Sequence, residues 1–349
     1  MNFRFAFLLT LFFAWTVFAT AAPKKSVNDD VDDVFEDVIE NLPGENFAAA
    51  WPGETRLAEK LPAKTIKDGP DEWIYETQHF QFHSPAPIAI SSIRKIAWIF
   101  EGTYVANLAL PLNAPCNHYQ VKEKGKFQAQ FYLDRESYQK SGAPANSAGY
   151  FRGSGDLSTG KTHVPFSSLG LEKAGKKYTK SGREVNAHTL VHEITHHMSI
   201  GAWMPQMPIW YQEGYADYVA SSPYTNGRIN FRNNRKSISN QVKLRLGGQK
   251  VYKAPIDLKT FMTQSQADFM HPERVQFSYG MALALFYYFC HCDGKRNAAR
   301  LKAYIKAMQA GEASIDIFLD GRSWDNFQKE VSKDIKSKLG VLITFPSVD

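Results

Sequence analysis

Two patterns of apolar residues divide the chain into a strand-rich first half and a helical second half. Residues 72–83 (EWIYETQHFQFH) and 125–134 (GKFQAQFYLD) alternate apolar with polar side chains, which predicts half-buried strands. Helical spacing recurs over residues 87–110, 184–200, 261–270, 277–290, 301–310 and 324–339. We therefore expect an α+β fold, with a small mixed or antiparallel sheet followed by a helical C-terminal region.

The first 22 residues have the pattern of a secretory signal peptide. Arg4 supplies the positive charge, residues 5–18 form an apolar run, and Ala19-Thr20-Ala21 is a small-residue cleavage signal. A membrane anchor is the alternative, but the apolar run is short for a bilayer span. We expect a secreted or periplasmic protein without stable membrane insertion after cleavage.

Residues 23–70 differ in composition from the rest of the chain, because acidic side chains cluster between Asp29 and Glu40. Residues 1–46 carry three basic and eight acidic residues, net −5, so the rest of the +6 chain is about +11. A solvated N-terminal extension is the usual interpretation, and an inhibitory segment over a basic surface is the alternative. We divide the remainder into an α+β subdomain (71–200) and a helical subdomain (201–349).

The predicted helix over 184–200 contains the sequence His192-Glu193-Ile194-Thr195-His196. Residues four apart share one face of a helix, so His192 and His196 can hold one zinc ion between them. Glu193 lies beside the first ligand and can reach a metal-bound water. Residue frequencies alone produce this pattern in about one chain of this length in a hundred, so more evidence is needed.

A second predicted helix, which begins near residue 208, offers the missing ligand. A catalytic zinc takes three protein ligands and keeps one position open, and Glu213 is the candidate for the third. Asp217 lies one turn later, where its carboxylate can accept a hydrogen bond from the free ring nitrogen of His192.

The neighbouring histidines fit the site less well. His188 and His196 lie about 12 Å apart along the helix axis, so one ion cannot bind both. His197 points about 100° away from the ligand face. Ser199 and Ala202 occupy the positions where a metzincin has Gly and His.

The HExxH motif at residues 192–196 and the WxxEGxAxY motif at residues 210–218 together resemble the gluzincin zinc peptidases, in particular the bacterial peptidase MA-like families. The likeness spans roughly residues 71–336, and its specific part is 188–218. It implies a zincin-like fold, Zn²⁺ bound by two histidines and a glutamate, and Glu193 as general base. The loop before Glu213 is shorter than in thermolysin, so the likeness to thermolysin does not extend to fold detail.

The resemblance implies two further roles. Tyr279 opens an apolar helix and is the candidate to stabilise the oxyanion, with a core tyrosine as the alternative interpretation and His188 as the other candidate. Residues 161–166 read as a short strand, where Pro165 indicates an edge position. Such peptidases hold an extended substrate on an edge strand, which makes His163, Val164 and Phe166 candidates for substrate contact. An ordinary edge strand without this role is the alternative.

The expected activity is zinc-dependent hydrolysis of peptide bonds in a peptide or protein substrate. A non-catalytic exported binding module with a structural or vestigial zinc site is one alternative. A zinc amidase or esterase acting on cell-envelope material is another. Residues 223–248 are rich in Arg and Lys but carry no nucleic-acid motif, so we expect a solvated face or an anionic surface contact there and no nucleic-acid partner.

The three cysteines allow at most one intrachain disulfide. Cys116 pairs more readily with Cys290 or Cys292 than these two pair with each other, since they are too close in sequence for relaxed geometry. Metal binding by Cys290, His291 and Cys292 is a further alternative, and a buried thiol on an apolar helix is the preferred interpretation.

Overall fold

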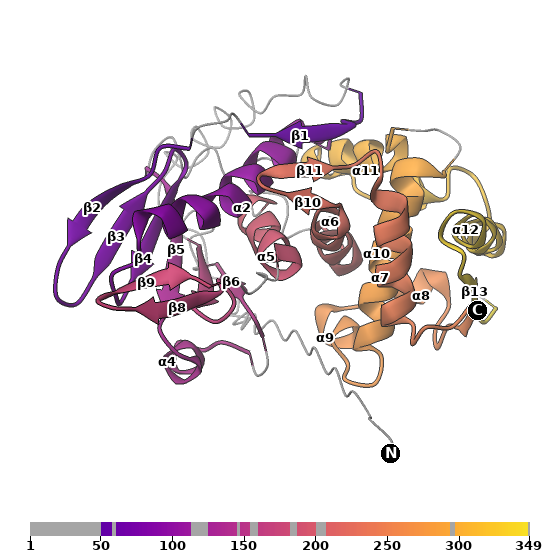
Figure 1. The fold of residues 1–349 in the computed structure, drawn as a ribbon. Coiled ribbons are helices and arrows are strands. Elements are labelled where there is room, and N and C mark those ends of the chain that lie inside the picture. The colour runs from indigo at the N-terminus through magenta and orange to yellow at the C-terminus, as the bar shows by residue number, and fades with distance from the viewer. Residues whose placement is uncertain are drawn as a thin grey trace, which may run out of the picture.

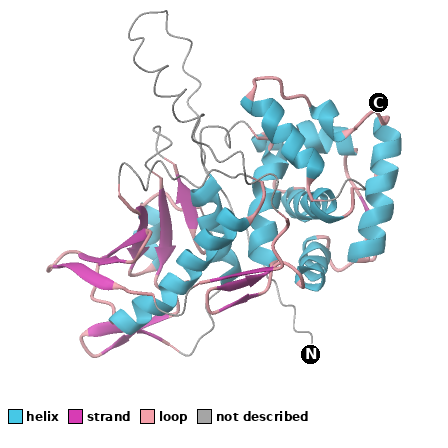
Figure 2. Ribbon diagram, turned by 90° about the horizontal axis from the view of Figure 1, so that it is seen from above, coloured by secondary structure: helices cyan, strands magenta, loops and turns pink. Residues whose placement is uncertain are grey.

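The computed structural model describes residues 50–57, 61–112, 125–144, 147–153, 160–181, 187–199, 207–293 and 297–347. The strands gather in one part of the molecule and most helices in the other (Figures 1 and 2). The fold is therefore a mixed α+β fold with a helical C-terminal region, as the apolar patterns predict. The predicted signal peptide and acidic cluster lie outside the described residues.

A mixed six-stranded sheet forms the strand-rich part. Its order is β2 (Lys64–Asp68), β3 (Trp73–Glu76), β4 (Phe80–Ser84), β5 (Phe127–Tyr132), β7 (Lys161–Pro165) and β6 (Tyr150–Arg152). The strands β4, β5 and β7 run parallel, and the other neighbours pair antiparallel. Buried and half-buried residues alternate along β5, which confirms the predicted strand at 125–134.

The predicted single strand over residues 72–83 is wrong, because this segment forms the hairpin β3–β4. The turn closes where Thr77 N–H donates to the Phe80 carbonyl at 2.9 Å. The Glu101 carboxylate stabilises this turn by accepting hydrogen bonds from the Thr77 hydroxyl at 2.7 Å and from the His79 N–H at 2.9 Å. The odd spacing between Tyr75 and Phe80, both buried, is the sequence signal for this break, since one continuous strand would place them on opposite faces.

The long helix α2 (Ile90–Ala109) covers one face of the sheet (Figure 1). Its Phe100 ring packs edge-on against Phe80 and Phe82 of β4, at centroid distances of 5.3 and 5.0 Å. Aromatic contacts of this geometry add to the burial of apolar area. The short helix α4 (Arg135–Lys140) follows β5, and the hairpin of β8 (Leu171–Ala174) and β9 (Lys177–Lys180) packs beside α2.

Three helices make the centre of the molecule. These are α5 (Ala187–Ser199), α6 (Ile209–Ser221) and α10 (Val275–His291). Helix α6 packs against α5 on one side and α10 on the other. The approach of α6 to α10 is close, because a Cβ at Gly214 would lie 2.5 Å from the Ala282 carbonyl oxygen. Helix α10 is buried nearly all round, as its apolar sequence predicts.

The other helices described after α6 each contact α10. They are α7 (Asn234–Arg245), α8 (Leu258–Thr263), α9 (Gln266–Phe269), α11 (Ala299–Gln309), the 3-10 helix η3 (Ile315–Phe318) and α12 (Trp324–Leu339). The prediction of one helix over 261–270 is wrong: the chain is extended at Gln264 and Ser265, and the Ser265 hydroxyl caps α9 by accepting from the Asp268 N–H at 3.1 Å.

Part of the predicted N-terminal extension belongs to the fold. Strand β1 (Glu54–Arg56) pairs with β11 (Arg228–Asn230), which also pairs with β10 (Tyr224–Thr225), and β2 lies at one edge of the main sheet. Trp51 donates a hydrogen bond from its indole nitrogen to the Tyr218 hydroxyl at 2.9 Å. The alternating pattern predicts that regular structure starts at residue 72, but strands β1 and β2 come before that residue. Near the C-terminus, β12 (Val251–Lys253) pairs in parallel with β13 (Leu342–Thr344).

Among the described residues, no helix combines the length and apolar character that a membrane span needs. Cys290 and Cys292 are free thiols, and Cys290 is buried on α10, as the preferred interpretation predicts. Cys116 lies outside the described residues.

Candidate metal centre

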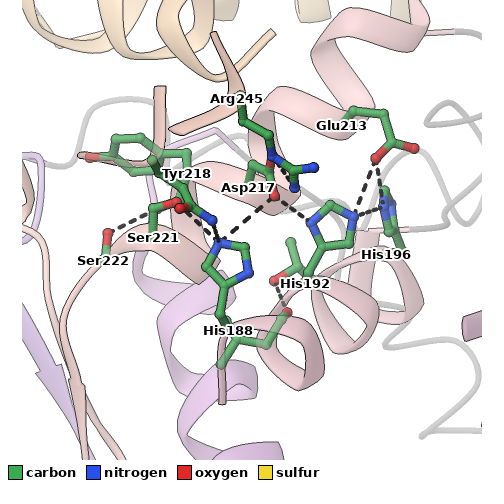
Figure 3. A network of polar contacts seen from close by, with 12 residues as sticks. His188, His192, His196, Glu213, Asp217, Tyr218, Ser221, Ser222 and Arg245 are labelled. Carbon is green, nitrogen blue, oxygen red and sulfur yellow. Dashed lines mark hydrogen bonds and ion pairs between the residues drawn. The ribbon is translucent and has the colours of Figure 1, made fainter. Parts of the chain in front are cut away.

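Two imidazoles and one carboxylate converge between α5 and α6 (Figure 3). The Nε2 atoms of His192 and His196, one helical turn apart on α5, are 3.0 Å from each other. The Glu213 carboxylate reaches them from α6, with Oε2 at 3.3 Å from His192 Nε2 and 3.4 Å from His196 Nε2. All three side chains are buried, at 8% exposure or less. Within the described part of the chain, this is the group of His, Cys, Asp or Glu side chains that converges closely enough to hold a metal ion.

The donor atoms of this group fit a zinc ion. Zinc binds imidazole nitrogen and carboxylate oxygen, and a catalytic zinc uses three protein ligands. The Glu213 Oε2 atom is buried and accepts no hydrogen bond from the described residues, although it lies between two imidazoles. A buried carboxylate oxygen without a hydrogen bond is costly, and a cation at the centre of the group satisfies it.

The second carboxylate of α6 orients the first ligand. Asp217 Oδ1 lies 2.9 Å from His192 Nδ1, so the ring donates Nδ1–H to Asp217 and presents Nε2 to the metal position. The structure thus brings together four of the residues that the two motifs supplied: His192, His196, Glu213 and Asp217. It also adds a residue that sequence reasoning missed: Arg245 at the end of α7, whose guanidinium lies 3.8 Å from Asp217 Oδ2. The basic segment 223–248 is expected to form a solvated face, but this side chain is buried.

The two carboxylates of α6 raise the pKa of the histidine that they both contact. Burial alone would lower the pKa of His192, but the Asp217 and Glu213 carboxylates outweigh it and raise the pKa to about 10. Burial likewise opposes ionisation of Glu213, but His196 and His192 hold its pKa down at about 2. The Asp217 pKa is also lowered, by His192 and Arg245 against the effect of burial. Both carboxylates therefore stay charged at neutral pH.

The candidate general base, Glu193, is fully buried beside the group. Its Oε2 atom accepts a hydrogen bond from the Phe151 N–H of strand β6 at 3.1 Å. Its Oε1 atom has no hydrogen-bond partner among the described residues. Burial raises the pKa of Glu193 to about 8. A carboxyl group with a pKa near neutrality suits proton transfer in both directions.

The other histidines of α5 stay outside the metal group, as expected from helix geometry. His188 Nε2 contacts the Ser221 hydroxyl at 3.3 Å (Figure 3). It also contacts the Gln241 amide at 3.2 Å. His197 is fully buried, and its Nδ1 lies 2.8 Å from the Thr162 hydroxyl. Burial lowers the pKa of His188 to about 4 and of His197 to about 3, so both rings are neutral.

Tyr279 lies on α10 near the site. Its ring centroid is 6.3 Å from that of His192, and the Arg245 guanidinium packs over it at 5.0 Å. Its hydroxyl donates to the Met270 sulfur at 3.9 Å. Burial, and then the Glu213 and Asp217 charges, raise the pKa of Tyr279 well above its ordinary value.

The predicted edge position of residues 161–166 is wrong. Strand β7 lies between β5 and β6, and the three-residue strand β6 occupies the edge. Pro165 is tolerated because it is the last residue of β7, beyond the pairs with β6. The three proposed substrate-contact residues are engaged within the fold. His163 stacks on Tyr150 at 4.4 Å, while Val164 and Phe166 are buried in the core.

No model of a protein family matches this chain, and no curated protein matches it. Fold and site together define an α+β protein with a buried His–His–Glu group that can hold a metal ion.

Proposed function

We propose that the chain is an exported zinc-dependent metallopeptidase of the gluzincin type, which hydrolyses peptide bonds. The observation that carries this proposal is the convergence of His192, His196 and Glu213 with Glu193 as the neighbour of the first ligand. Zinc, when bound, polarises the scissile carbonyl and lowers the pKa of water. Export is supported by the signal-peptide pattern over residues 1–22.

The protein's own residues supply the rest of the chemistry. Asp217 holds the His192 ring in the tautomer that offers Nε2 as a ligand. Glu193, whose Oε1 has no hydrogen-bond partner among the described residues, takes a proton from water and delivers it to the leaving nitrogen. A bare zinc-binding module needs no such carboxyl group beside the ligands, which favours an enzyme over that alternative.

Tyr279 remains the candidate that stabilises the developing charge on the substrate carbonyl oxygen. Because its pKa is raised, the hydroxyl keeps its proton and can donate a hydrogen bond. To donate to the substrate, the hydroxyl must give up its hydrogen bond to the Met270 sulfur. This loss costs little, because a thioether sulfur is a weak acceptor. Replacing Tyr279 by Phe should lower kcat and leave zinc content intact.

The decisive experiment compares zinc content and peptide hydrolysis in the purified chain, with and without a chelator. We expect about one zinc per chain and hydrolysis that the chelator abolishes. Glu193→Gln should keep the zinc and lose turnover, while Glu136→Gln, an exposed surface change, should match the wild type. Hydrolysis that survives in Glu193→Gln, or a chain that binds no zinc, rejects the proposal. Cleavage of cell-envelope amides or esters in place of peptides identifies the alternative hydrolase.

A further inference from the structure

Phe151 connects the edge strand to the candidate general base through its backbone. Its N–H donates to Glu193 Oε2 at 3.1 Å, and this contact joins β6 to α5. Strand β6 pairs on one side with β7, where Phe151 lies opposite Thr162. In an antiparallel pair, successive N–H groups alternate between the partner strand and the other side. The Phe151 N–H is on the side away from β7, where the carboxylate of α5 accepts it.

The Phe151 side chain is held by the same helix. Its ring is buried and lies 4.8 Å from the His197 ring, which is one turn after Glu193 on the same face of α5. His197 is itself tied to the sheet, since its Nδ1 lies 2.8 Å from the hydroxyl of Thr162. Backbone and ring of Phe151 thus contact two residues of α5 that are four positions apart.

Two glycines shape the space around this contact. A Cβ at Gly160 would lie 2.2 Å from the tip of the Phe151 ring, so the ring can occupy its place only because residue 160 lacks a side chain. A Cβ at Gly149, the residue before β6, would meet Glu193 Cγ at 3.4 Å, so the backbone there packs against the aliphatic part of Glu193. The position of the Glu193 carboxylate is therefore coupled to the packing of Phe151.

From these contacts we infer that Phe151 is a positioning residue for Glu193. The Phe151 N–H holds one carboxylate oxygen, and the ring, clamped between His197 and Gly160, keeps that N–H in place. This leaves Oε1, which has no hydrogen-bond partner in the described part of the chain, to exchange a proton. Misplacement of a catalytic group by about 1 Å can cost on the order of 100-fold in rate, so the clamp matters to turnover although Phe151 touches no reacting atom. The catalytic consequence rests on the proposed function, but the contact does not.

The contact is tested by NMR on the full chain with ¹⁵N-labelled phenylalanine, in which Phe151→Leu identifies the Phe151 amide signal. Glu193→Ala removes the acceptor, so the Phe151 amide proton should shift upfield and exchange faster with solvent. The control Glu136→Ala removes an exposed carboxylate and should leave the signal unchanged. If the chemical shift and exchange rate of the Phe151 amide proton do not change in Glu193→Ala, the inference is overturned, whether or not the protein hydrolyses peptides.

The consequence is tested by kinetics and zinc content together. Gly160→Ala should displace the ring and lower kcat at least 10-fold, with KM and zinc content near wild type. The control Gly69→Ala should be silent, because its added Cβ meets nothing closer than the Glu72 carbonyl oxygen at 3.5 Å. Phe151→Ala should lower kcat likewise, and Phe151→Leu, which keeps apolar volume, should restore most of it.

The outcomes separate this inference from the proposed function. Unchanged kcat in both Phe151→Ala and Gly160→Ala overturns the positioning role, as does a loss of zinc that parallels the loss of kcat. If Gly160→Ala fails to fold, the comparison of kcat between Phe151→Ala and Phe151→Leu alone tests the positioning role. A wild-type chain without peptidase activity, whose Phe151 amide still responds to Glu193→Ala, rejects the proposed function and supports the contact.

Discussion

His192 Nδ1 and Asp217 Oδ1 are 2.9 Å apart, across the interface between α5 and α6. Asp217 lies one turn after Glu213, so a single face of α6 supplies both a candidate ligand and the carboxylate that orients another ligand (Figure 3). The geometry of the metal group therefore depends on how these two helices pack.

Asp217→Asn should weaken zinc binding without removing it. The amide cannot carry the negative charge that favours the required tautomer and raises the basicity of His192. Loss of such an outer carboxylate lowers metal affinity by roughly 10- to 100-fold. Competition with a chromophoric chelator measures the change, and Asp257→Asn, at the N-cap of α8, is the matched control. An affinity equal to wild type in Asp217→Asn contradicts the orienting role.

Glu213→Ala should reduce zinc content more severely than Asp217→Asn does. The substitution removes one of three donor atoms and leaves two imidazoles that face each other at 3.0 Å. Metal analysis after dialysis should find well below one zinc per chain, while circular dichroism reports whether α6 remains helical. Full zinc content in this variant refutes the assignment of Glu213 as the third ligand.

Gly214→Ala should destabilise the protein through the α6–α10 contact. The added methyl group would lie 2.5 Å from the Ala282 carbonyl oxygen, and neither helix backbone can move away without disturbing the buried core. Overpacking of this kind costs typically about 1–3 kcal/mol of unfolding free energy. Urea unfolding measures the effect, with Gly69→Ala as the control. A midpoint equal to that of the control contradicts the close approach.

Acid should destabilise the protein through two half-buried histidines. Burial lowers the pKa of His291 to about 4, from an ordinary value of 6.5, and His163 behaves alike. Between these two pH values the unfolded chain binds a proton that the folded chain does not. The unfolding free energy therefore falls as pH drops from about 6.5 to about 4, by up to about 3 kcal/mol for each ring.

His291→Gln isolates one of these contributions. The variant should lose less stability than wild type between pH 7 and pH 4.5 in urea unfolding. His271→Gln changes an exposed histidine and should keep the wild-type slope. Equal slopes in wild type and His291→Gln would show that the half-buried ring does not resist protonation.

Local patterns predicted the long elements well. Helix α12 has the predicted bounds, Trp324–Leu339, and α10 differs by only a few residues. Periodicity succeeds there because an amphipathic or wholly apolar helix records its burial in its own sequence. It failed at residues 77–79 and 264–265, where short turns interrupt a pattern that otherwise continues.

The sequence by itself determined that His192 and His196 share a face, because the helical repeat converts a spacing of four into proximity. It also marked Glu213 and Asp217 as a pair on one face of the next helix. Only the tertiary structure decided that these two faces meet, that Arg245 is buried beside Asp217, and that β6 rather than β7 takes the edge beside Glu193. These relationships join residues that lie far apart in the chain. They arise from the packing of helices and the pairing of strands, and the local spacing of residues does not encode either.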